Sequence, residues 1–355
     1  MSVIDHQVWL YIGTYAETQE AGIHVAVMNQ NTGELKLVSH VKGVENPSYL
    51  ALSEDATHLY AASEKDEGEV LAYSIDSEHA LHLLDRKPTG GGAPCYVQLT
   101  TDGRYLLAAN YTGANASSFP VNEDGSLGDR SGNVQHEGKG THPERQDAAH
   151  THSIVPSLDG SIAYVSDLGQ DIVAAYHLGE DGSLAEAGST SLPPAAGPRH
   201  LVFHPNGQLA YGINELDSTV TAYFRNVETG VLEILNTVST LPKDFDEENT
   251  GGDIRLSLCG RYVYASNRGH DSIVQYAIDQ EAGTVSVVEW VHVKGRTPRN
   301  FAVVPGGYVL VCNQDSGNIV QFAADPETGR LTPTGHELTV DRPVCLMADM
   351  NEVED

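Results

Sequence analysis

The sequence repeats itself, and this repetition restricts the chain to a small set of folds. A turn followed by an apolar residue, as in NTGELKLV, recurs seven times at intervals of 46 to 57 residues. The apolar residues of these signals are Leu35, Leu81, Leu127, Leu184, Leu232, Val285 and Leu331. Units of this length that are built from short strands are typical of ring-shaped β-propellers.

A second pattern alternates with the first and has the form of a β-hairpin. NPSYLALSEDATHLYAASE (46–64) aligns with APCYVQLTTDGRYLLAANY (93–111) and with GPRHLVFHPNGQLAYGINE (197–215). Each copy is an apolar run, a turn of the D-G or N-G type, and a second run rich in Tyr, Val and Ala, which predicts two antiparallel strands. A third short run such as DIVAAYHL follows, and we expect a fourth strand to begin at each turn-plus-apolar signal.

The two ends of the chain carry complementary halves of one repeat. WLYIGTY (9–15) has the pattern of a second strand without its first, and DRPVCLMAD (341–349) that of a first strand without its second. We therefore predict one all-β domain over residues 1–355: a seven-bladed β-propeller with four antiparallel strands per blade, closed by N- and C-terminal strands that share one blade. A β-sandwich would not require seven matched units with complementary ends.

The charge of the chain excludes several classes of partner. Net charge is −29, with 49 acidic and 20 basic residues, and no basic cluster is present, so nucleic acid and anionic membranes are not expected partners. No apolar run approaches the roughly 20 residues that cross a bilayer. The N-terminal stretch MSVIDHQVWLYIG lacks a secretion signal, and the four cysteines form no C-x-x-C pair. We expect a cytoplasmic protein that is a monomer or a weak homodimer.

Alignment of the repeats separates scaffold positions from variable ones. One position within the first strand is apolar in all seven units: Leu50, Val97, Ile154, Leu201, Ile254, Phe301 and Leu346. The second strand ends on a small polar residue in all seven: Thr14, Ser63, Asn110, Asp167, Asn214, Asn267 and Asn313. Such a side chain satisfies loop amides, so we interpret this second set as structural.

Other positions differ from unit to unit and meet at one mouth of the ring. The start of the first strand holds His152, Arg199 and Arg299 in different units, and the residue after the second strand is Glu215 in one and Arg268 in another. Guanidinium groups suit carboxylate and phosphate oxygens, so a locally basic mouth could draw a small anion to an acidic protein. The alternative is that each arginine pairs with a nearby acid such as Glu215 or Asp253.

The stretch AAHTHSIVPSLDG contains the pair His150 and His152. An H-x-H pair in a strand places both rings on one face, as some metal sites require. The aligned positions supply no ring of carboxylates around the axis, and we expect neither a metal nor a cofactor. His152 aligns with Arg199 and should face the mouth, with His150 at its rim. The long segments Gly125–His150 and Thr240–Gly252 enter the same face and are expected to wall the pocket.

Several stretches resemble the cytosolic propeller lactonase family, namely IGTYAE, NPSYLALS, GGAPCYV, NYTG, HPERQDAAHTHSIVPS, GPRHLVFHPNG, NELDSTV, SNRGHDSI and TPRNFAV. The resemblance runs from Leu10 to Met347. It implies hydrolysis of 6-phosphogluconolactone to 6-phosphogluconate, in the oxidative pentose phosphate route. One departure is GGDIRLSLCG, in which Arg255 and Cys259 stand where a His and an Asp are expected.

The resemblance also implies a set of site residues. A related fungal carboxymuconate lactonizing enzyme has a proposed site of one His, two Arg and one Glu, which maps onto His152 (or His150), Arg199, Glu215 and Arg268. We expect these four to be catalytic. Further contacts to a small anionic sugar lactone are expected from His150, His200, Asp253, Arg255, His270, Arg299, Asn300 and Gln314.

The chemistry of these side chains is compatible with lactone opening. A neutral histidine can activate water near pH 7, arginine can stabilise the oxyanion or hold a phosphate, and Glu215 can orient either. No G-x-S-x-G motif is present, so a covalent serine intermediate is not expected. A lactonizing isomerase that acts on a dicarboxylate and a non-catalytic binding propeller remain alternatives. The grouping of His, Arg and Glu around one axis disfavours the latter.

Overall fold

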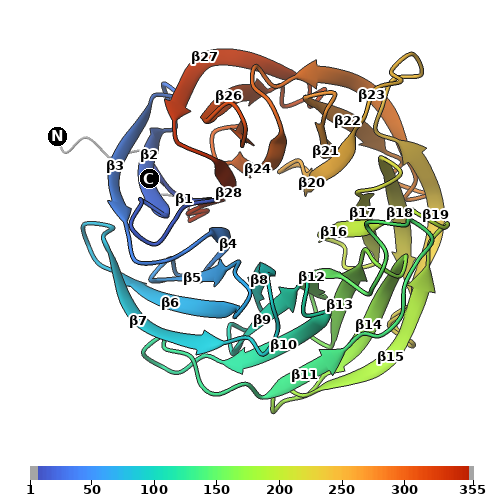
Figure 1. Ribbon diagram of the computed structural model, residues 1–355. Coiled ribbons are helices and arrows are strands. Elements are labelled where there is room, and N and C mark those ends of the chain that lie inside the picture. Colours follow the sequence, from blue (N-terminus) through green and yellow to red (C-terminus); the bar gives the residue numbers. More distant parts are fainter. Residues whose placement is uncertain (1–6, 352–355) are drawn as a thin grey trace.

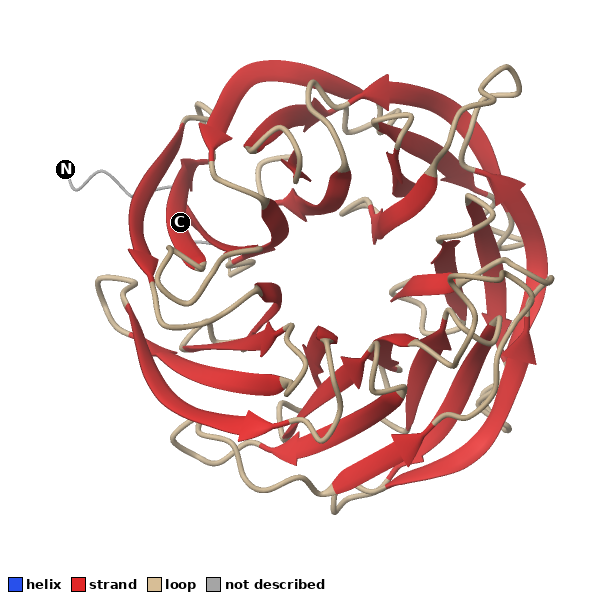
Figure 2. Ribbon diagram, in the orientation of Figure 1, coloured by secondary structure: helices blue, strands red, loops and turns tan. Residues whose placement is uncertain are grey.

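The computed structural model describes residues 7–351, which form a closed ring of seven four-stranded antiparallel sheets around a central axis (Figure 1). Every regular element within these residues is a strand, and loops and turns join the strands (Figure 2). The predicted seven-bladed β-propeller is therefore confirmed. Blade 1 contains β28 and β1 to β3, and blades 2 to 7 follow in chain order from β4–β7 to β24–β27. No helix that could span a membrane occurs in the described part of the chain.

Each blade runs outward from the axis through four strands. The innermost are β28 (Pro343–Ala348), β4 (Pro47–Leu52), β8 (Pro94–Leu99), β12 (Thr151–Pro156), β16 (Pro198–Phe203), β20 (Thr250–Leu256) and β24 (Pro298–Val304). The second are β1 (Gln7–Thr14), β5 (His58–Ser63), β9 (Tyr105–Asn110), β13 (Ile162–Asp167), β17 (Leu209–Asn214), β21 (Tyr262–Arg268) and β25 (Tyr308–Asn313). The third are β2 (Ile23–Asn29), β6 (Glu69–Ile75), β10 (Asn115–Pro120), β14 (Ile172–Leu178), β18 (Thr219–Arg225), β22 (Ser272–Ile278) and β26 (Asn318–Ala324). The outermost are β3 (Leu35–Val41), β7 (Leu81–Pro88), β11 (Gly132–Gln135), β15 (Leu184–Ser191), β19 (Leu232–Ser239), β23 (Val285–His292) and β27 (Leu331–Thr339).

The outermost strands begin where the repeat signal predicts, with one exception. In six blades the strand starts at the signal residue itself. In blade 3 the prediction is wrong, because Leu127 forms only an isolated bridge with Val121 and β11 begins at Gly132. Leu127 is 2% exposed and packs into the core, so the apolar signal marks a buried residue here and not a strand start.

The ring closes as the split repeat predicts. β1 pairs antiparallel with β28, with Leu10 opposite Ala348 and Gly13 opposite Cys345. Strands from the two ends of the described chain therefore share blade 1, which Figure 1 shows as β28 beside β1. Closure leaves each blade with a neighbour on both sides.

Neighbouring blades are joined by apolar packing and by a recurrent tyrosine hydrogen bond. The apolar position predicted within each innermost strand is buried in all seven blades, with no member more than 5% exposed. Second-strand tyrosines donate to a glycine carbonyl of the next blade, as from Tyr60 to Gly125, at 3.0 Å, and from Tyr211 to Gly283, at 3.2 Å. Each bond satisfies a buried hydroxyl and ties one blade to the next.

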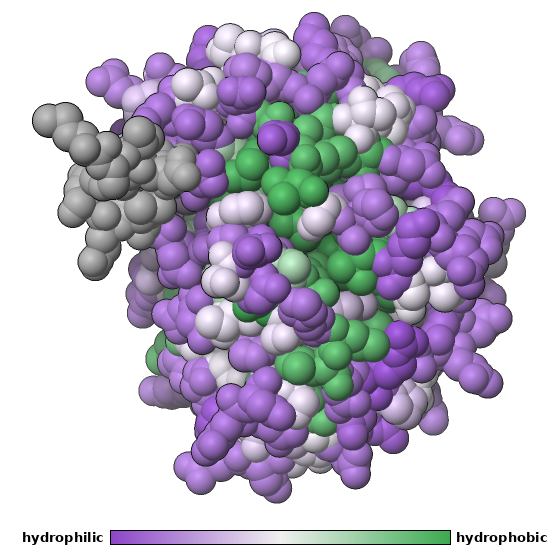
Figure 3. All heavy atoms as spheres, turned by 90° about the vertical axis from the view of Figure 1, so that its left-hand side faces the viewer, coloured by the Kyte–Doolittle hydropathy of each residue, from purple (hydrophilic) through white to green (hydrophobic). Residues whose placement is uncertain are grey.

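The outer face of the ring carries some exposed apolar side chains. Leu37 and Val38 on β3 and Leu83 and Leu84 on β7 are 38 to 48% exposed. Figure 3 looks at this side of the molecule and shows hydrophobic patches among mostly hydrophilic residues. Exposed apolar side chains are common on protein surfaces, because polar residues do not cover the whole of a folded protein.

Candidate functional site

Every innermost strand contains one extra residue at the same place. In β12 the pairing with β13 shifts between Thr151 and Ser153, so His152 has no partner across the ladder. Equivalent shifts occur in the other six blades, and the extra residue is Arg199 in β16 and Arg299 in β24. Such β-bulges re-aim a side chain that would otherwise follow the pleat. The bulge explains why the variable position of the repeat reaches the mouth.

The mouth at this end of the ring contains a cavity of about 360 Å³. Its lining comes from blades 2 to 7 and from the segment that precedes β12. The lining residues are Glu64, Cys95, Tyr111, Arg145, His152, Glu215, Thr250, Arg268 and Arg299. Three of the four residues predicted to be catalytic thus line one cavity, and the fourth, Arg199, lies directly behind Glu215.

Glu215 is the centre of a buried ion cluster. Arg145 Nη2 donates to its Oε1 at 2.5 Å, whereas Arg199 Nε at 3.0 Å and Arg268 Nη2 at 2.8 Å approach its Oε2. Burial alone would raise the pKa of Glu215, but Arg268 and Arg199 hold it well below its usual range. Burial lowers the pKa of Arg268 to about 10, so its guanidinium stays charged at neutral pH. For Arg199 and Arg268, the structure therefore shows the pairing with Glu215 that the sequence left as an alternative.

Sequence analysis missed Arg145, because it lies in a segment that no other repeat contains. Gln146 fixes this segment: its amide nitrogen donates to Leu168 O and Asp171 Oδ1, and its Oε1 accepts from the amides of Thr141 and His142. The side chain of Gln146 is almost fully buried. The sequence did predict that the long segments Gly125–His150 and Thr240–Gly252 wall the pocket, and this was the one signal that pointed toward Arg145. The first segment contributes Arg145 to the cavity lining and the second contributes Thr250.

His152 is a buried imidazole without a short hydrogen bond. Its Nε2 lies 3.8 Å from Glu215 Oε2, and its Nδ1 lies 3.7 Å from Cys95 Sγ. Burial, Arg199 and His200 lower its pKa well below the usual value, so the ring is neutral at pH 7. Burial also raises the pKa of the Cys95 thiol, which leaves it protonated and a poor nucleophile. A neutral imidazole at the cavity wall can accept a proton from water.

His150 occupies a different place from His152. Its ring stacks on Tyr111 at 4.4 Å between centroids, and its Nδ1 lies 3.1 Å from Tyr111 O. Tyr111 lines the cavity and His150 does not. The structure therefore places His152, and not His150, beside Glu215.

Four further predicted contact residues form a network beneath the cavity. Asp253 is 1% exposed and accepts hydrogen bonds from His200 Nδ1 at 2.7 Å and Asn300 Nδ2 at 2.8 Å, while Arg255 Nη2 lies 3.0 Å from its Oδ2. Although burial opposes it, Arg255 and His200 lower the pKa of Asp253 to about 2. Burial and Arg199 lower the pKa of His200 to about 3, so its ring is neutral. None of the four lines the cavity.

Aromatic rings fill the axis at the level of this network. Tyr49 stacks on Tyr96 with centroids 4.2 Å apart, and both rings meet His200 edge-on, at 5.6 and 5.2 Å. These residues belong to blades 2, 3 and 5, so the contacts cross the centre of the ring. The opening between the ribbons in Figure 1 is thus filled by side chains below the cavity.

Two predicted contact residues lie away from the cavity. His270 packs against Phe245 and His292, with centroids 4.8 and 5.0 Å apart, and its Nδ1 bonds Ser272. Gln314 donates to Asp315 on the exposed rim. Neither lines the cavity.

The cavity carries an excess of positive charge in an acidic protein. Its lining contains the guanidinium groups of Arg145, Arg268 and Arg299 against the carboxylates of Glu64 and Glu215, and the buried Arg199 behind Glu215 adds a further positive charge. A site of this kind attracts an anion of about the size of a sugar phosphate.

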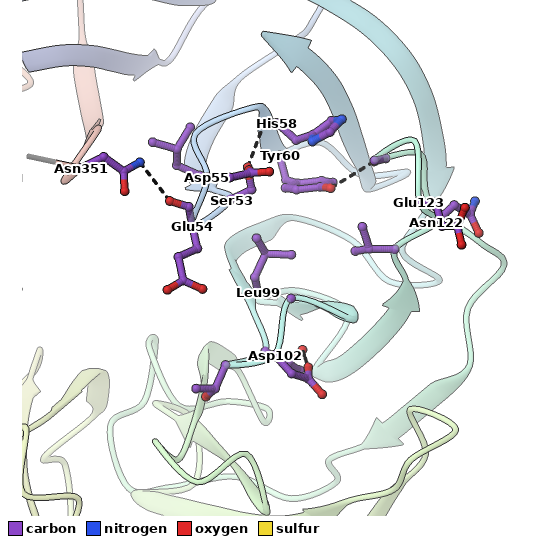
Figure 4. Close-up of a pocket in the computed structure, with 16 residues that line it drawn as sticks. Ser53, Glu54, Asp55, His58, Tyr60, Leu99, Asp102, Asn122, Glu123 and Asn351 are labelled. Atoms are coloured by element: carbon purple, nitrogen blue, oxygen red, sulfur yellow. Dashed lines mark hydrogen bonds between the residues drawn. The ribbon is translucent and has the colours of Figure 1, made fainter. Parts of the chain in front are cut away.

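A larger cavity, of about 820 Å³, lies at the opposite face, between the hairpin turns of blades 2 and 3. Figure 4 shows its carboxylates, from Glu54, Asp55, Asp102 and Glu123. It contains none of the predicted site residues and repels anions. We therefore place the candidate site at the smaller, basic cavity.

Within residues 7–351, no group of three or more His, Cys, Asp or Glu side chains is arranged to hold a metal ion. The H-x-H pair is split between two environments: His150 lies against Tyr111, and His152 lies beside Cys95 and Glu215. We expect any enzymatic activity of this site to survive treatment with EDTA. Loss of activity that a divalent cation restores would contradict this expectation.

Comparison with known proteins identifies relatives along almost the whole chain. The model of the family described as "Lactonase, 7-bladed beta-propeller" matches residues 9–348. A 6-phosphogluconolactonase of Bacillus subtilis (strain 168) is 37% identical over 297 residues, which are 83% of this chain and 84% of the relative. A 6-phosphogluconolactonase of Formosa agariphila is 36% identical over 309 residues, 84% of this chain and 87% of the relative.

A solved structure agrees with these matches. The periplasmic gluconolactonase of Pseudomonas aeruginosa is 32% identical, superposes with a TM-score of 0.89, and matches over 96% of this chain and 99% of its own. The resemblance noted in the sequence, and the enzyme class that it implies, are thereby confirmed.

Proposed function

Because the chain belongs to the family of seven-bladed β-propeller lactonases, we propose that it hydrolyses the ring ester of 6-phosphogluconolactone to give 6-phosphogluconate. The observation that carries this proposal is the cavity whose lining combines a neutral imidazole with three arginines and two carboxylates, with a fourth arginine, Arg199, behind Glu215. The names of two relatives support the substrate. The reaction would belong to the oxidative pentose phosphate route.

The reaction begins with water activation. His152 accepts a proton from a water molecule as the water oxygen attacks the lactone carbonyl carbon, and the carbonyl oxygen becomes an oxyanion. Arg268 lines the cavity next to Glu215 and carries the positive charge that stabilises this oxyanion. The bond between the carbonyl carbon and the ring oxygen then breaks, and the ring oxygen takes the proton from His152. The products are a free hydroxyl and a carboxylic acid, which releases its proton to solvent to become the carboxylate, so no external oxidant or reductant is needed.

Glu215 and Arg199 act behind the reacting groups. Glu215 holds the guanidinium of Arg268 and lies 3.8 Å from His152, so its charge stabilises the imidazolium that forms during the reaction. Arg199 is 2% exposed and also donates to Gly252 O, at 2.6 Å, which fixes Glu215 from below. We also propose that the protein acts as a monomer or a weak homodimer.

We also propose a cytoplasmic location, where phosphorylated sugars are made and consumed. The four cysteines are free, as expected in a reducing compartment. The relative from Pseudomonas aeruginosa is named a periplasmic gluconolactonase. Its name thus combines a location outside the cytoplasm with a lactone that carries no phosphate.

An assay with freshly generated 6-phosphogluconolactone tests the proposed function. We expect the protein to accelerate its hydrolysis well above the spontaneous rate and to prefer it to unphosphorylated gluconolactone, because the cavity attracts anions. The matched controls are spontaneous hydrolysis without protein and a muconolactone, which carries carboxylate in place of phosphate. Acceleration of the muconolactone alone would favour the isomerase alternative, and acceleration of no lactone would refute the proposed function.

A further inference from the structure

Arg299 differs from every other arginine of the chain. The sequence contains thirteen arginines, and Arg299 is the one for which the described residues supply neither a hydrogen-bond acceptor nor an ion pair. It nevertheless lines the cavity and sits at the bulge of an innermost strand. A guanidinium has five N–H donors, and such groups are rarely left without acceptors. Its donors are therefore available to a ligand in the cavity.

Tyr15 holds the guanidinium of Arg299 without using its donors. The Cζ atom of Arg299 lies 5.1 Å from the centroid of the Tyr15 ring, which is the geometry of a cation–π contact. The Tyr15 hydroxyl donates to Glu64 Oε2 at 3.0 Å, which fixes the ring in turn. The Tyr15 ring contains no acceptor that Arg299 bonds in the described chain, so this contact leaves the N–H donors of Arg299 unused.

The positions of Arg299 and His152 at the cavity suit the two ends of the proposed substrate. Arg299 belongs to blade 7 and His152 to blade 4, three blades away in a ring of seven, so these two lining residues stand across the cavity from each other. In 6-phosphogluconolactone the reacting carbonyl carbon and the phosphate are at opposite ends of the carbon chain. A lactone whose carbonyl lies beside His152 would direct its phosphate across the cavity, toward blades 7, 1 and 2.

The other arginines of the site are already bound to a carboxylate. Arg145, Arg199 and Arg268 all donate to or pair with Glu215. No carboxylate of the described chain lies within 4.0 Å of Arg299, and Glu64 gives its Oε2 to Tyr15. A phosphate would find the donors of Arg299 without first displacing an internal partner.

We propose that Arg299, held by Tyr15, is the phosphate-binding group of this site, and that Glu64 accepts hydrogen bonds from sugar hydroxyls next to it. This assignment rests on the proposed function, because it names the end of the substrate that each side of the cavity receives. Tyr15 is a positioning residue that acts through Arg299.

Steady-state kinetics of the full-length protein test the assignment with 6-phosphogluconolactone and gluconolactone as paired substrates. Arg299→Gln removes the charge and retains much of the side-chain volume. We expect its kcat/KM for the phosphorylated lactone to fall about 10- to 100-fold, as for a lost charge-assisted hydrogen bond, and mainly through KM. The fall for gluconolactone should be much smaller, so the ratio between the substrates is the readout.

Tyr15 offers a graded test of the same contact. Tyr15→Phe retains the ring face under Arg299, and Tyr15→Leu removes it. We expect Tyr15→Leu to lower the ratio as Arg299→Gln does, and Tyr15→Phe to lower it much less. The matched control is Arg296→Gln, an exposed arginine in the loop just before β24 that contacts Asp315 O, and its ratio should equal that of the wild type. An equal loss for both substrates in Arg299→Gln would overturn the assignment.

A binding measurement separates failure of the assignment from failure of the proposed function. Calorimetry with 6-phosphogluconate needs no turnover, and we expect Arg299→Gln to bind it about 10- to 100-fold more weakly than wild type. Equal affinity of the two proteins, or no binding by the wild type, would overturn the assignment. Absence of lactone hydrolysis by a wild-type protein that still binds 6-phosphogluconate through Arg299 would refute only the proposed reaction.

Discussion

Replacement of His152 by glutamine should lower kcat for lactone hydrolysis about a hundred- to ten-thousandfold, the usual contribution of a general base. Glutamine has a similar length but accepts no proton near pH 7. The measurement is the rate with 6-phosphogluconolactone after subtraction of spontaneous hydrolysis, together with the melting temperature to confirm folding. Because the pKa of His152 is well below its usual value, the acid limb of the wild-type pH profile should lie well below pH 6.5.

His150→Gln is the control for this experiment. His150 stacks on Tyr111 and lies outside the cavity lining, so its loss should lower kcat far less than the loss of His152. Equal effects of the two substitutions, or a larger effect at His150, would contradict the assignment of the base. If His152→Gln fails to fold, the residue has a structural role instead.

Replacement of Glu215 by glutamine should give the largest loss of stability of any site variant. The substitution leaves Arg145, Arg199 and Arg268 around a neutral side chain in a buried cluster. Removal of one partner from a buried ion pair costs about 3 to 5 kcal/mol. Chemical unfolding should show this decrease in the free energy of unfolding, and activity should fall too, because Arg268 loses its anchor.

The pH dependence of stability checks the same cluster. The pKa of Glu215 is lowered in the folded protein, so the unfolded chain takes up the proton first as the pH falls. The charge of Glu215 therefore stabilises the fold fully at a pH above the pKa that Glu215 has in the unfolded chain. This stabilisation is lost as the pH falls from that pKa toward the lower pKa of Glu215 in the folded protein. Wild-type stability should decline below about pH 4.5 more steeply than that of Glu215→Gln.

Glu64→Gln is the control for the stability measurement. The Glu64 carboxylate accepts a hydrogen bond from Tyr15 but has no ion pair within 4.0 Å in the described chain, so this substitution should lower the free energy of unfolding by less than Glu215→Gln does. A decrease in Glu64→Gln as large as in Glu215→Gln would contradict the proposed importance of the cluster.

The fold was predictable because the sequence contains seven copies of the same pattern of short strands and turns. The hairpin signal of residues 46–64 and its copies specify strands through turn chemistry and alternation, and the incomplete halves at 9–15 and 341–349 specify closure. The exception at Leu127 has a physical reason. An apolar residue after a turn must be buried, but burial does not require a strand, and Leu127 is buried without one.

The site was predictable only where the repeats align. His152, Arg199 and Arg299 share an aligned position, and the structure shows that each is the extra residue of a bulge. Arg145 has no counterpart in other repeats, so alignment could not reveal it. Its place at the cavity depends on the conformation of one loop, which the hydrogen bonds of Gln146 fix. The contact between Tyr15 and Arg299 joins residues almost three hundred positions apart, and only closure of the ring brings them together.

The bulges also have a consequence for how such a protein changes over time. The extra residue of each innermost strand lies outside the ladder pairing, so substitution there alters the contents of the mouth without removing a pair from a sheet. Ser48, Cys95 and Val344 occupy this position with small side chains, whereas Gly252 is constrained because a Cβ would lie 2.7 Å from Pro298 O. Selection, or a protein engineer, can therefore vary substrate preference at the bulge positions that take no part in the Glu215 cluster and have room for a larger side chain, without changing the pairing of the sheets.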